Sequence, residues 1–425
     1  MKNILFVLIV LLGLQACKKD TFNYQTYTAE VGDIDSIYFS TGSTSLIADG
    51  KATLQFVLEA YRKVQIKDAG GQPRDTMMYV DYAKLPKAEV KIFADGQLVD
   101  GMEYQVKYLS KNTREFYAQI GGLKSKVKSV QIKAPKPLGA KRYIDVVFHV
   151  FELSTTDPGY DALTYQDIQQ KQLESAIAYA NAVFNNVYGK DPNGGQANFE
   201  FRLAKKNPAG MALALPGYNK ILYDASWKAS PTAQFLPTNF TAKINATAAY
   251  QWNKDKFLNI YIYPTVANTS IGNNRAAYQL VPAGQQAIEG IANIVNSEAE
   301  IPTTDFYTIY GLGIQRSIFF PESSLKIEIA PHLGIYYGLY ATNSITLPVN
   351  DFVADTKKYF TGNTQTANQS SGLLKTGLDG EKFLANNAMD DVRFASLRNS
   401  FTQGQIERMR LVMERCPVRK AWQSE

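Results

Sequence analysis

The chain has 425 residues, which is enough for two or three domains that each bury a core. Its formal net charge of +6 is small for this length, and no predicted helix gathers Lys and Arg on one face, so nucleic acid is not an expected partner. With two cysteines and two histidines, the composition excludes a disulfide framework and leaves few side chains that bind metals tightly.

Residues 1–17 are typical of an export signal rather than of a folded element. A positive start at Lys2 precedes an apolar run over 4–14, which is short for a permanent membrane span. The run ends in Leu-Gln-Ala-Cys, which resembles the lipobox of bacterial lipoproteins and implies lipidation of Cys17. The Lys-Lys-Asp that follows resembles an export signal of surface lipoproteins in some Gram-negative bacteria. We therefore expect an outer-membrane lipoprotein, exposed at the cell surface and held to the membrane through Cys17.

The next residues form a short tether and then a β domain. Residues 18–30 are polar and without periodicity, whereas apolar and polar residues alternate in 52–58 and 88–93. Turn sequences such as Asp95-Gly96 separate the alternating segments. About seven short strands over a hundred residues predict a β-sandwich in 31–138, and residues 45–53 resemble the first hairpin of bacterial immunoglobulin-like domains.

A second domain is expected over residues 143–425. Residues 144–151 form a nearly continuous β-branched and aromatic run, as in a strand buried on both faces. A helix with Thr164 as its N-cap is predicted next, and further strands are predicted at 199–203 and 257–263. This order favours an α/β or α+β domain with a mixed sheet backed by helices, ending in a helix over 402–414.

Taken in order, these elements resemble the catalytic domain of pappalysin-type zinc metalloproteases, which belong to the metzincin clan. IDVVFHVFE resembles the opening strand of that family, and RAAYQLVP resembles the strand at the edge of its cleft. NAMDD resembles the Met-turn segment, which implies that Met389 lies under the metal position. The resemblance covers about 280 residues and implies a metalloprotease fold.

The defining signature of that clan is H-E-x-x-H-x-x-G-x-x-H, in which three His hold Zn²⁺ and the Glu acts as general base. IEIAPHLGIYYGLYAT, at 327–342, resembles the helix that carries this signature, and the frame fits without a gap. Its glycine is intact, but all four chemical groups are replaced. In the order of the signature, the aligned residues are Pro331, His332, Ile335, Gly338 and Ala341.

These replacements remove the ligands of the zinc that the family would bind, so no metal and no catalytic residue is predicted. Starting the frame at His332 places Leu333 in the Glu position and restores nothing. His149 belongs to the opening strand, where a buried structural role is expected. A weak site made of His332 and Glu328, one turn apart, is the remaining metal-binding alternative.

Pro331 allows two local structures. In a helix that begins near Ser323, Pro331 removes one backbone hydrogen bond and costs about 3 kcal/mol or kinks the helix. If residues 325–329 form a short strand instead, Pro331 is a natural first helical residue. We expect the kinked helix, because the family resemblance requires a helix here.

Three functional hypotheses follow. The first is a surface pseudoprotease that binds a peptide, protein or glycan in its vestigial cleft without cleaving it. The second is an active zinc endopeptidase, as the family would imply, and the third is a structural or adhesion subunit of the cell surface. We favour the first and expect no enzymatic activity. Four tyrosines are candidates for the lining of the cleft: Tyr278, Tyr336, Tyr337 and Tyr340. For at least two of the last three, a buried position in the core is the favoured alternative.

Overall fold

The computed structural model describes residues 28–223, 228, 230, 236–264, 276–322, 325–362, 372–392 and 397–423. The predicted export signal, Cys17 and most of the tether lie outside them. The described residues divide into two compact units. The first holds 28–37, Glu59–Lys91 and Gln119–Lys124, and the second holds Tyr38–Leu58, Ile92–Ala118 and the described residues from Ser125 onward. No helix in the described ranges is long and apolar enough to cross a membrane.

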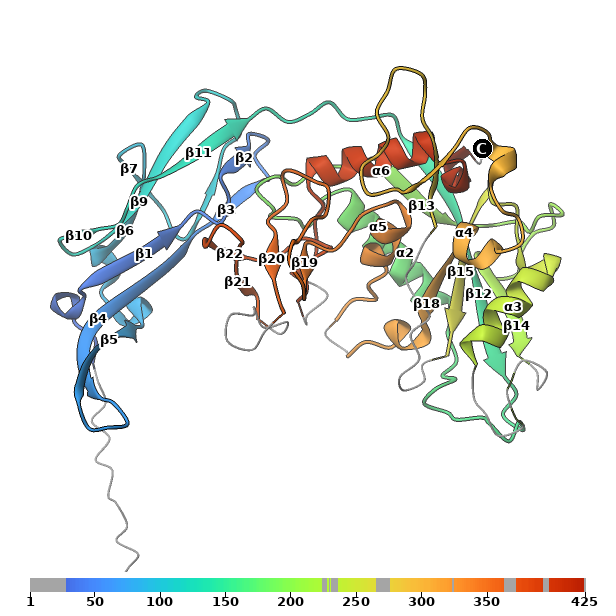
Figure 1. Cartoon of the computed structure of the whole chain (residues 1–425), viewed down its shortest axis with the longest axis horizontal. Helices are drawn as coiled ribbons and strands as arrows, with labels where there is room; N and C mark the ends of the chain where they lie inside the picture. Colours follow the sequence, from blue (N-terminus) through green and yellow to red (C-terminus); the bar gives the residue numbers. More distant parts are fainter. Residues whose placement is uncertain are drawn as a thin grey trace, which may run out of the picture. The chain divides into compact units, whose positions relative to one another are not determined.

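The region before residue 138 consists mostly of strands, so the predicted all-β class is confirmed (Figure 1). Asp95 and Gly96 both have positive φ angles, as a tight turn between two antiparallel strands requires. Eleven strands replace the seven or so that the alternation predicts, because turns interrupt it more often. The strands are β1 (Ser36–Ser40), β2 (Ser45–Ile47), β3 (Thr53–Gln55), β4 (Val57–Lys67), β5 (Pro73–Val80), β6 (Val90–Ala94), β7 (Gln97–Val99), β8 (Glu103–Gln105), β9 (Thr113–Ile120), β10 (Leu123–Lys124) and β11 (Lys128–Lys133).

The C-terminal part is α/β, as predicted. Its strands are β12 (Arg142–Leu153), β13 (Phe199–Leu203), β14 (Tyr218–Tyr223), β15 (Phe257–Tyr263), β16 (Tyr278–Leu280), β17 (Asn293–Val295), β18 (Gly311–Gln315), β19 (Asn343–Ser344), β20 (Tyr359–Phe360), β21 (Leu374–Thr376) and β22 (Lys382–Leu384). Its helices are α2 (Gln170–Phe184), α3 (Pro237–Ala246), α4 (Phe306–Tyr310), α5 (Ala330–Tyr336) and α6 (Gln403–Arg415).

A five-stranded sheet forms the centre of the C-terminal part, in the order β13-β12-β15-β18 with β14 also paired to β12. Every pairing within it is parallel. β13 pairs with the first half of β12 and β14 with the second half, on the edge of β12 opposite β15. Antiparallel pairing occurs in this part between β21 and β22. Mixed pairing therefore describes the C-terminal part as a whole and not the five-stranded sheet itself.

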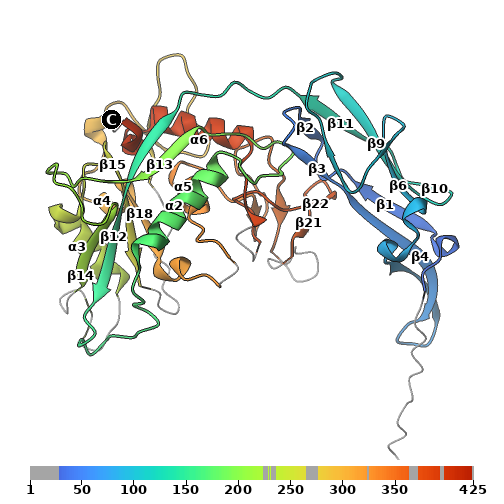
Figure 2. The same cartoon turned by 180° about the vertical axis from the view of Figure 1, so that it is seen from behind.

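Both faces of this sheet are covered, which explains the nearly continuous apolar run in β12. Phe148 and its even-numbered neighbours pack into one core with α2 and α5, whereas Phe151 and Leu153 pack into a second core with α3 and α4. α2 lies in front of the sheet in Figure 2, and α3 and α4 lie in front of it in Figure 1. A strand buried on both faces was predicted here, and it is confirmed.

Local sequence sets the ends of the helices. α6 begins after Thr402, whose hydroxyl accepts a hydrogen bond from the Gln405 backbone N–H in a capping box, close to the predicted start. The predicted start of α2 is wrong, because the hydroxyl of Thr164 donates to the Asp161 carboxylate and the N-cap is Gln169. α2 therefore begins at Gln170, six residues after the predicted cap.

Candidate functional site

The helix that carries the degenerate signature is short and begins at Ala330. Pro331 lies in its first turn, where a missing N–H costs nothing because no intrahelical acceptor is available there. The expected kinked helix is therefore wrong, since residues 326–329 are not helical. The alternative strand over 325–329 does not form either. Pro331 nevertheless lies at the start of α5, as the second alternative predicted.

α5 ends in a tight turn that only glycine accommodates easily. Gly338 has a φ of +85°, and its N–H donates to Ile335 O at 3.0 Å. The N–H of Leu339 donates to Gly334 O at 2.9 Å, which completes the pair of hydrogen bonds of a Schellman motif. Gly338 therefore turns the chain sharply after α5, as the glycine of the signature does.

A turn containing Met389 packs beneath α5. The Met389 N–H donates to Asn387 Oδ1 and the Asp390 N–H donates to Asn387 O, each at 3.0 Å. Asn387 is held by a hydrogen bond to Gln405 of α6 at 2.8 Å. A Cβ added at Gly334 would lie 3.1 Å from Met389 Sδ, so the thioether contacts the backbone of α5 directly. Met389 thus lies under the helix that bears the signature.

Thr342, just after the helix, connects it to this turn. Its hydroxyl donates to Asp390 Oδ1 at 2.6 Å, and its N–H donates to Met389 O at 3.3 Å. Burial raises the pKa of Asp390 to about 6, while its hydrogen bonds from Thr342 and Asn387 oppose that shift. Asp390 therefore serves to join these two segments.

The residues at the four chemical positions do not fit a zinc ion. Pro331, Ile335 and Ala341 offer no side-chain nitrogen, oxygen or sulfur, so His332 is the one donor left in the frame. Within the described ranges, no group of three or more His, Cys, Asp or Glu side chains could hold a metal. Glu328, the proposed partner of His332 in a weak site, forms an ion pair with Arg398 at 2.5 Å. That ion pair competes with any use of the carboxylate as a ligand.

A pocket of about 430 Å³ lies against the end of α5. Ile335 and Ala341, at the second and third ligand positions of the signature, line it together with Gly338. The pocket is also lined by residues 276–277, which precede β16, and by residues 290–293, which lead into β17. The positions that hold the metal in the signature therefore contribute apolar groups to this pocket, which we call the α5 pocket.

The four tyrosines expected near the cleft occupy different places. Tyr336 and Tyr340 line the α5 pocket, and the Tyr340 hydroxyl donates to Gly290 O at 2.6 Å across it. Tyr337 is buried in the core, where its ring packs near Phe199 and Phe201, so for this residue the core alternative applies and not the cleft. Tyr278 is not among the residues that line the pocket and packs at the edge of the second core instead.

The expected cleft-edge strand forms as β16, but it does not join the five-stranded sheet. β16 pairs in parallel with β17, from Tyr278 opposite Asn293 to Leu280 opposite Val295. The amide of Gln279, between them, is fully buried and bonds to Ile288 and Ile291. This side chain fixes the loop that forms one wall of the α5 pocket.

Arg419, which was not predicted to have a role, holds two segments of the pocket lining through hydrogen bonds to their backbone. Its side chain is fully buried, and its Nε donates to Tyr336 O at 2.6 Å. Its Nη1 donates to Ile309 O at 2.6 Å and its Nη2 to Ala276 O at 3.4 Å. The acceptors lie 83 to 143 residues away along the chain, so no local pattern could have identified this role.

Comparison with known families agrees with the resemblance drawn from the motifs. The model of the peptidase family described as pregnancy-associated plasma protein-A matches residues 242–414, which include β15, α5, the Met389 turn and most of α6. The C-terminal part is therefore metalloprotease-like. Among curated proteins, none matches the chain.

Three solved structures of mirolysin are similar over 67% of this chain. Mature Tannerella forsythia mirolysin in complex with a cleaved peptide is 20% identical, is covered over 97% of its length and has a TM-score of 0.37. Mirolysin in complex with a small compound is 19% identical, is also covered over 97% and has a TM-score of 0.43. A promirolysin mutant from T. forsythia is 18% identical, is covered over 84% and has a TM-score of 0.37. At these values the likeness says nothing about activity or substrate.

Proposed function

We propose that this chain is a surface-anchored lipoprotein whose metalloprotease-like domain binds an extended peptide without cleaving it. The observation that carries the proposal is the lining of the α5 pocket. The signature frame and its glycine turn persist, but Ile335 and Ala341 place apolar groups where metal ligands belong. The alternative functions, an active endopeptidase or a structural adhesion subunit, are outcomes of the tests below.

Loss of catalysis follows from the chemistry of the replaced groups. A zinc peptidase needs three ligands to hold the ion, which lowers the pKa of a bound water, and a carboxylate that takes the proton from that water. Pro331, Ile335 and Ala341 cannot supply the first requirement, and an imidazole at His332 replaces the carboxylate. No step of peptide hydrolysis is therefore assigned to these residues.

Peptide binding needs none of those groups. An extended peptide gains affinity from backbone hydrogen bonds along a strand edge and selectivity from pockets for alternate side chains. The α5 pocket adjoins β16 and β17, and the side chain of Ile294 in β17 is 57% exposed. The small residues Ala276, Ala277 and Ala292 leave room in the pocket for a large apolar side chain of the ligand.

Zinc content and peptide binding test the proposal together on the soluble form that begins at Lys18. We expect less than about a tenth of an equivalent of zinc after purification without chelator, no saturable zinc site at micromolar concentration, and no cleavage of casein. One tightly held equivalent of zinc together with casein cleavage would establish the active enzyme instead.

Binding is measured with a library of extended peptides that vary one central apolar residue. The variant Ala341→Trp places a large ring in the pocket at an exposed position and is expected to weaken binding by about tenfold or more. Ala209→Trp, at an exposed alanine that does not line the pocket, is the matched control and should bind as wild type does. If no peptide binds, or if Ala341→Trp binds normally, the α5 pocket is not a peptide site. That result would favour the hypothesis of a structural or adhesion subunit.

The anchor is tested separately. Growth with labelled palmitate should label the full chain and not the variant Cys17→Ser, and protease added to intact cells should digest the protein if it faces outward. Label retained by Cys17→Ser would contradict the lipobox assignment.

A further inference from the structure

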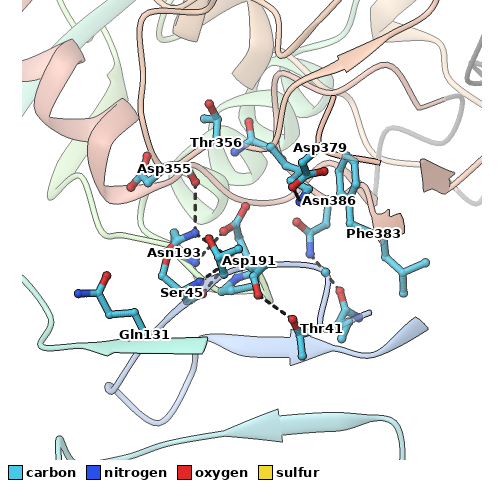
Figure 3. Close-up of a pocket in the computed structure, with 18 of the residues that line it drawn as sticks. Thr41, Ser45, Gln131, Asp191, Asn193, Asp355, Thr356, Asp379, Phe383 and Asn386 are labelled. Carbon is cyan, nitrogen blue, oxygen red and sulfur yellow. Dashed lines mark hydrogen bonds and ion pairs between the residues drawn. The ribbon is translucent and has the colours of Figure 1, made fainter. Parts of the chain in front are cut away.

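A second pocket, of about 320 Å³, lies away from α5 and has a different chemistry. Most of its lining comes from four segments of the second compact unit, 41–45, 191–193, 354–357 and 383–390, and the rest comes from Gln55, Gln131, Lys133 and Asp379 of the same unit. Figure 3 shows their polar side chains converging on one hollow. We call it the polar pocket, because hydroxyl, carboxamide and carboxylate groups make up most of its lining.

The walls of the polar pocket are held by hydrogen bonds between segments that are distant in the sequence. The Ser45 hydroxyl donates to Asn193 Oδ1 at 2.7 Å, and Asn193 Nδ2 donates to Asp355 O at 3.2 Å (Figure 3). On the other side, Asn386 Nδ2 donates to Gln55 Oε1 at 3.1 Å. The lining is therefore organised before any ligand arrives, which reduces the entropy that binding must offset.

The lining carries only a small net charge. Four aspartates and two lysines line the pocket, and Lys357 is paired with Asp379 at 2.5 Å. Asp191 is only 9% exposed, and burial together with the nearby Asp355 and Asp390 carboxylates raises its pKa to about 7. Near neutral pH the Asp191 carboxyl is therefore partly protonated and can donate as well as accept a hydrogen bond. Such a lining suits a neutral ligand.

The lining also offers unused donors and unused acceptors. The side chains of Thr44, Gln131 and Lys133 make no hydrogen bond to another described residue, and all three are exposed. The Asp355 and Asp379 carboxylates retain lone pairs beyond the bonds that they accept, because each oxygen can accept more than one. A simple cation could use only the acceptors, whereas a hydroxyl group donates and accepts at once. Such a mixed lining suits a ligand with many hydroxyls.

One aromatic residue completes the lining. Phe383, which is labelled in Figure 3, is only 6% exposed; its ring packs against Tyr359 at a centroid distance of 5.7 Å and has Lys357 Nζ over it at 6.0 Å. It therefore adds a small apolar patch to the polar lining. The pocket volume is at the lower end of the roughly 300–1,000 Å³ of small-molecule sites. These features suit one or two rings of a sugar.

We propose that the polar pocket binds a neutral saccharide, as a free sugar or as the end of a glycan. Its hydroxyls would exchange hydrogen bonds with the carboxylate, carboxamide and hydroxyl groups of the wall. This site is separate from the α5 pocket, and the proposal does not depend on peptide binding there.

Calorimetric titration of the Lys18–Glu425 form with a defined panel tests the proposal. The panel holds glucose, galactose, mannose, N-acetylglucosamine, maltose, cellobiose and lactose. At least one member is expected to bind with a Kd below about 10 mM, as a small polar site allows. Ala354→Trp, at an exposed alanine of the rim, should weaken that binding by about tenfold or more. Ala209→Trp should leave it unchanged, and Ala341→Trp should do so as well because it lies in the other pocket.

Folding of each variant is checked by its melting temperature. If Ala354→Trp does not fold, Thr44→Tyr, at an exposed position of the opposite wall, takes its place. The proposal is overturned if no sugar of the panel binds below about 10 mM, or if blocking the polar pocket leaves sugar binding intact. If Ala354→Trp abolishes sugar binding but still binds peptide, the saccharide site and the peptide site are independent.

Discussion

His149 is one of two histidines in the chain, and its surroundings keep it neutral. The ring is fully buried in β12 and stacks on Tyr261 at 4.6 Å. Its Nε2 lies 2.9 Å from Asn259 Oδ1, and its Nδ1 lies 2.8 Å from Asn219 Nδ2. Because an amide oxygen only accepts and an amide nitrogen only donates, the proton of the neutral ring is on Nε2. The predicted structural role of a buried histidine agrees with this geometry.

Burial lowers the pKa of His149 to about 4, although the bond to Asn259 opposes the shift. The folded-state pKa thus lies below the unfolded value of 6.5, so the unfolded chain binds the proton first as the pH falls. The stability that His149 contributes is complete above pH 6.5 and is lost as the pH falls to about 4, by about 3 kcal/mol in all.

The measurement is the free energy of unfolding in urea between pH 4 and pH 7.5, compared with His149→Gln. The difference between the two proteins is the relevant quantity, because burial raises the pKa values of Asp191, Glu328 and Asp390 and these carboxyls act with the opposite sign. Parallel curves for the two proteins would show that His149 is not held neutral in the folded state.

At the scale of single residues, the sequence shows which side chains stand at a motif, but it does not show which side chains they contact. The residues at the signature positions of 327–342 can be read directly, because they depend only on which side chains stand at given spacings. Cys416 is buried, and burial raises the pKa of its thiol to about 11, a property that its identity alone does not show. The sequence could not show that Tyr337 is buried while Tyr340 is exposed, because the turn at Gly338 decides which way the chain runs between them.

At the scale of an element, the turn at Gly338 determines how α5 ends and how closely α6 packs against it. Gly338 combines a φ of +85° with close packing, because a Cβ there would lie 2.8 Å from Val412 Cγ2 of α6. Gly338→Ala should therefore cost both the strain of a left-handed alanine, about 1 kcal/mol, and the displacement of α6. We expect a total loss of about 2–3 kcal/mol in the free energy of unfolding.

Gly210→Ala provides the matched control for that measurement. Gly210 has a φ of +83°, and a Cβ there would meet nothing within 4 Å, so the substitution tests the backbone term alone. It should cost about 1 kcal/mol. Equal losses for the two variants in urea unfolding would mean that α6 does not press on the turn.

Helices and strands were predicted correctly where neighbouring residues determine them. They were predicted wrongly where contacts with distant residues set their ends. The strand over 144–151 and the last helix, predicted over 402–414 and observed as α6, follow from side chains within a few residues of each other. Thr164 looked like a cap, but its hydroxyl serves a turn with Asp161. Pro331 was placed inside a longer helix because the family frame suggested one, whereas the preceding residues leave α5 short.

At the scale of the whole molecule, the domain boundaries predicted at 138 and 143 remain a prediction. Several hydrogen bonds within the second compact unit cross them. The Ile47 N–H donates to Pro192 O at 2.9 Å, and Ser45 bonds to Asn193 at 2.7 Å. Lys128 also forms an ion pair with Glu381 at 2.6 Å. Such pairings involve polar groups far apart in sequence, which no periodicity reveals.

A form that begins at Tyr143 would lack all the partners before that residue. Compared with the form that begins at Lys18, it should unfold with about 3 kcal/mol less free energy, because the buried Asn193 and the Pro192 carbonyl lose their partners. Its melting temperature should fall by about 6 °C. The polar pocket should also lose its sugar, since Ser45 and Gln131 are removed. Equal melting temperatures would establish that 143–425 folds as an independent domain.

The parallel pairing of β12 has a consequence for how the chain folds. Arg142 pairs with Phe199, and Asp145 pairs with Phe257, so none of the neighbours of β12 can reach it through a hairpin. Contacts between residues so far apart in sequence slow folding, because long loops must close before any pairing is gained. During synthesis, this largely apolar strand keeps an open edge until β15 has been made, more than a hundred residues later. β12 is thus the segment that a holding chaperone would have to shield until the sheet is complete.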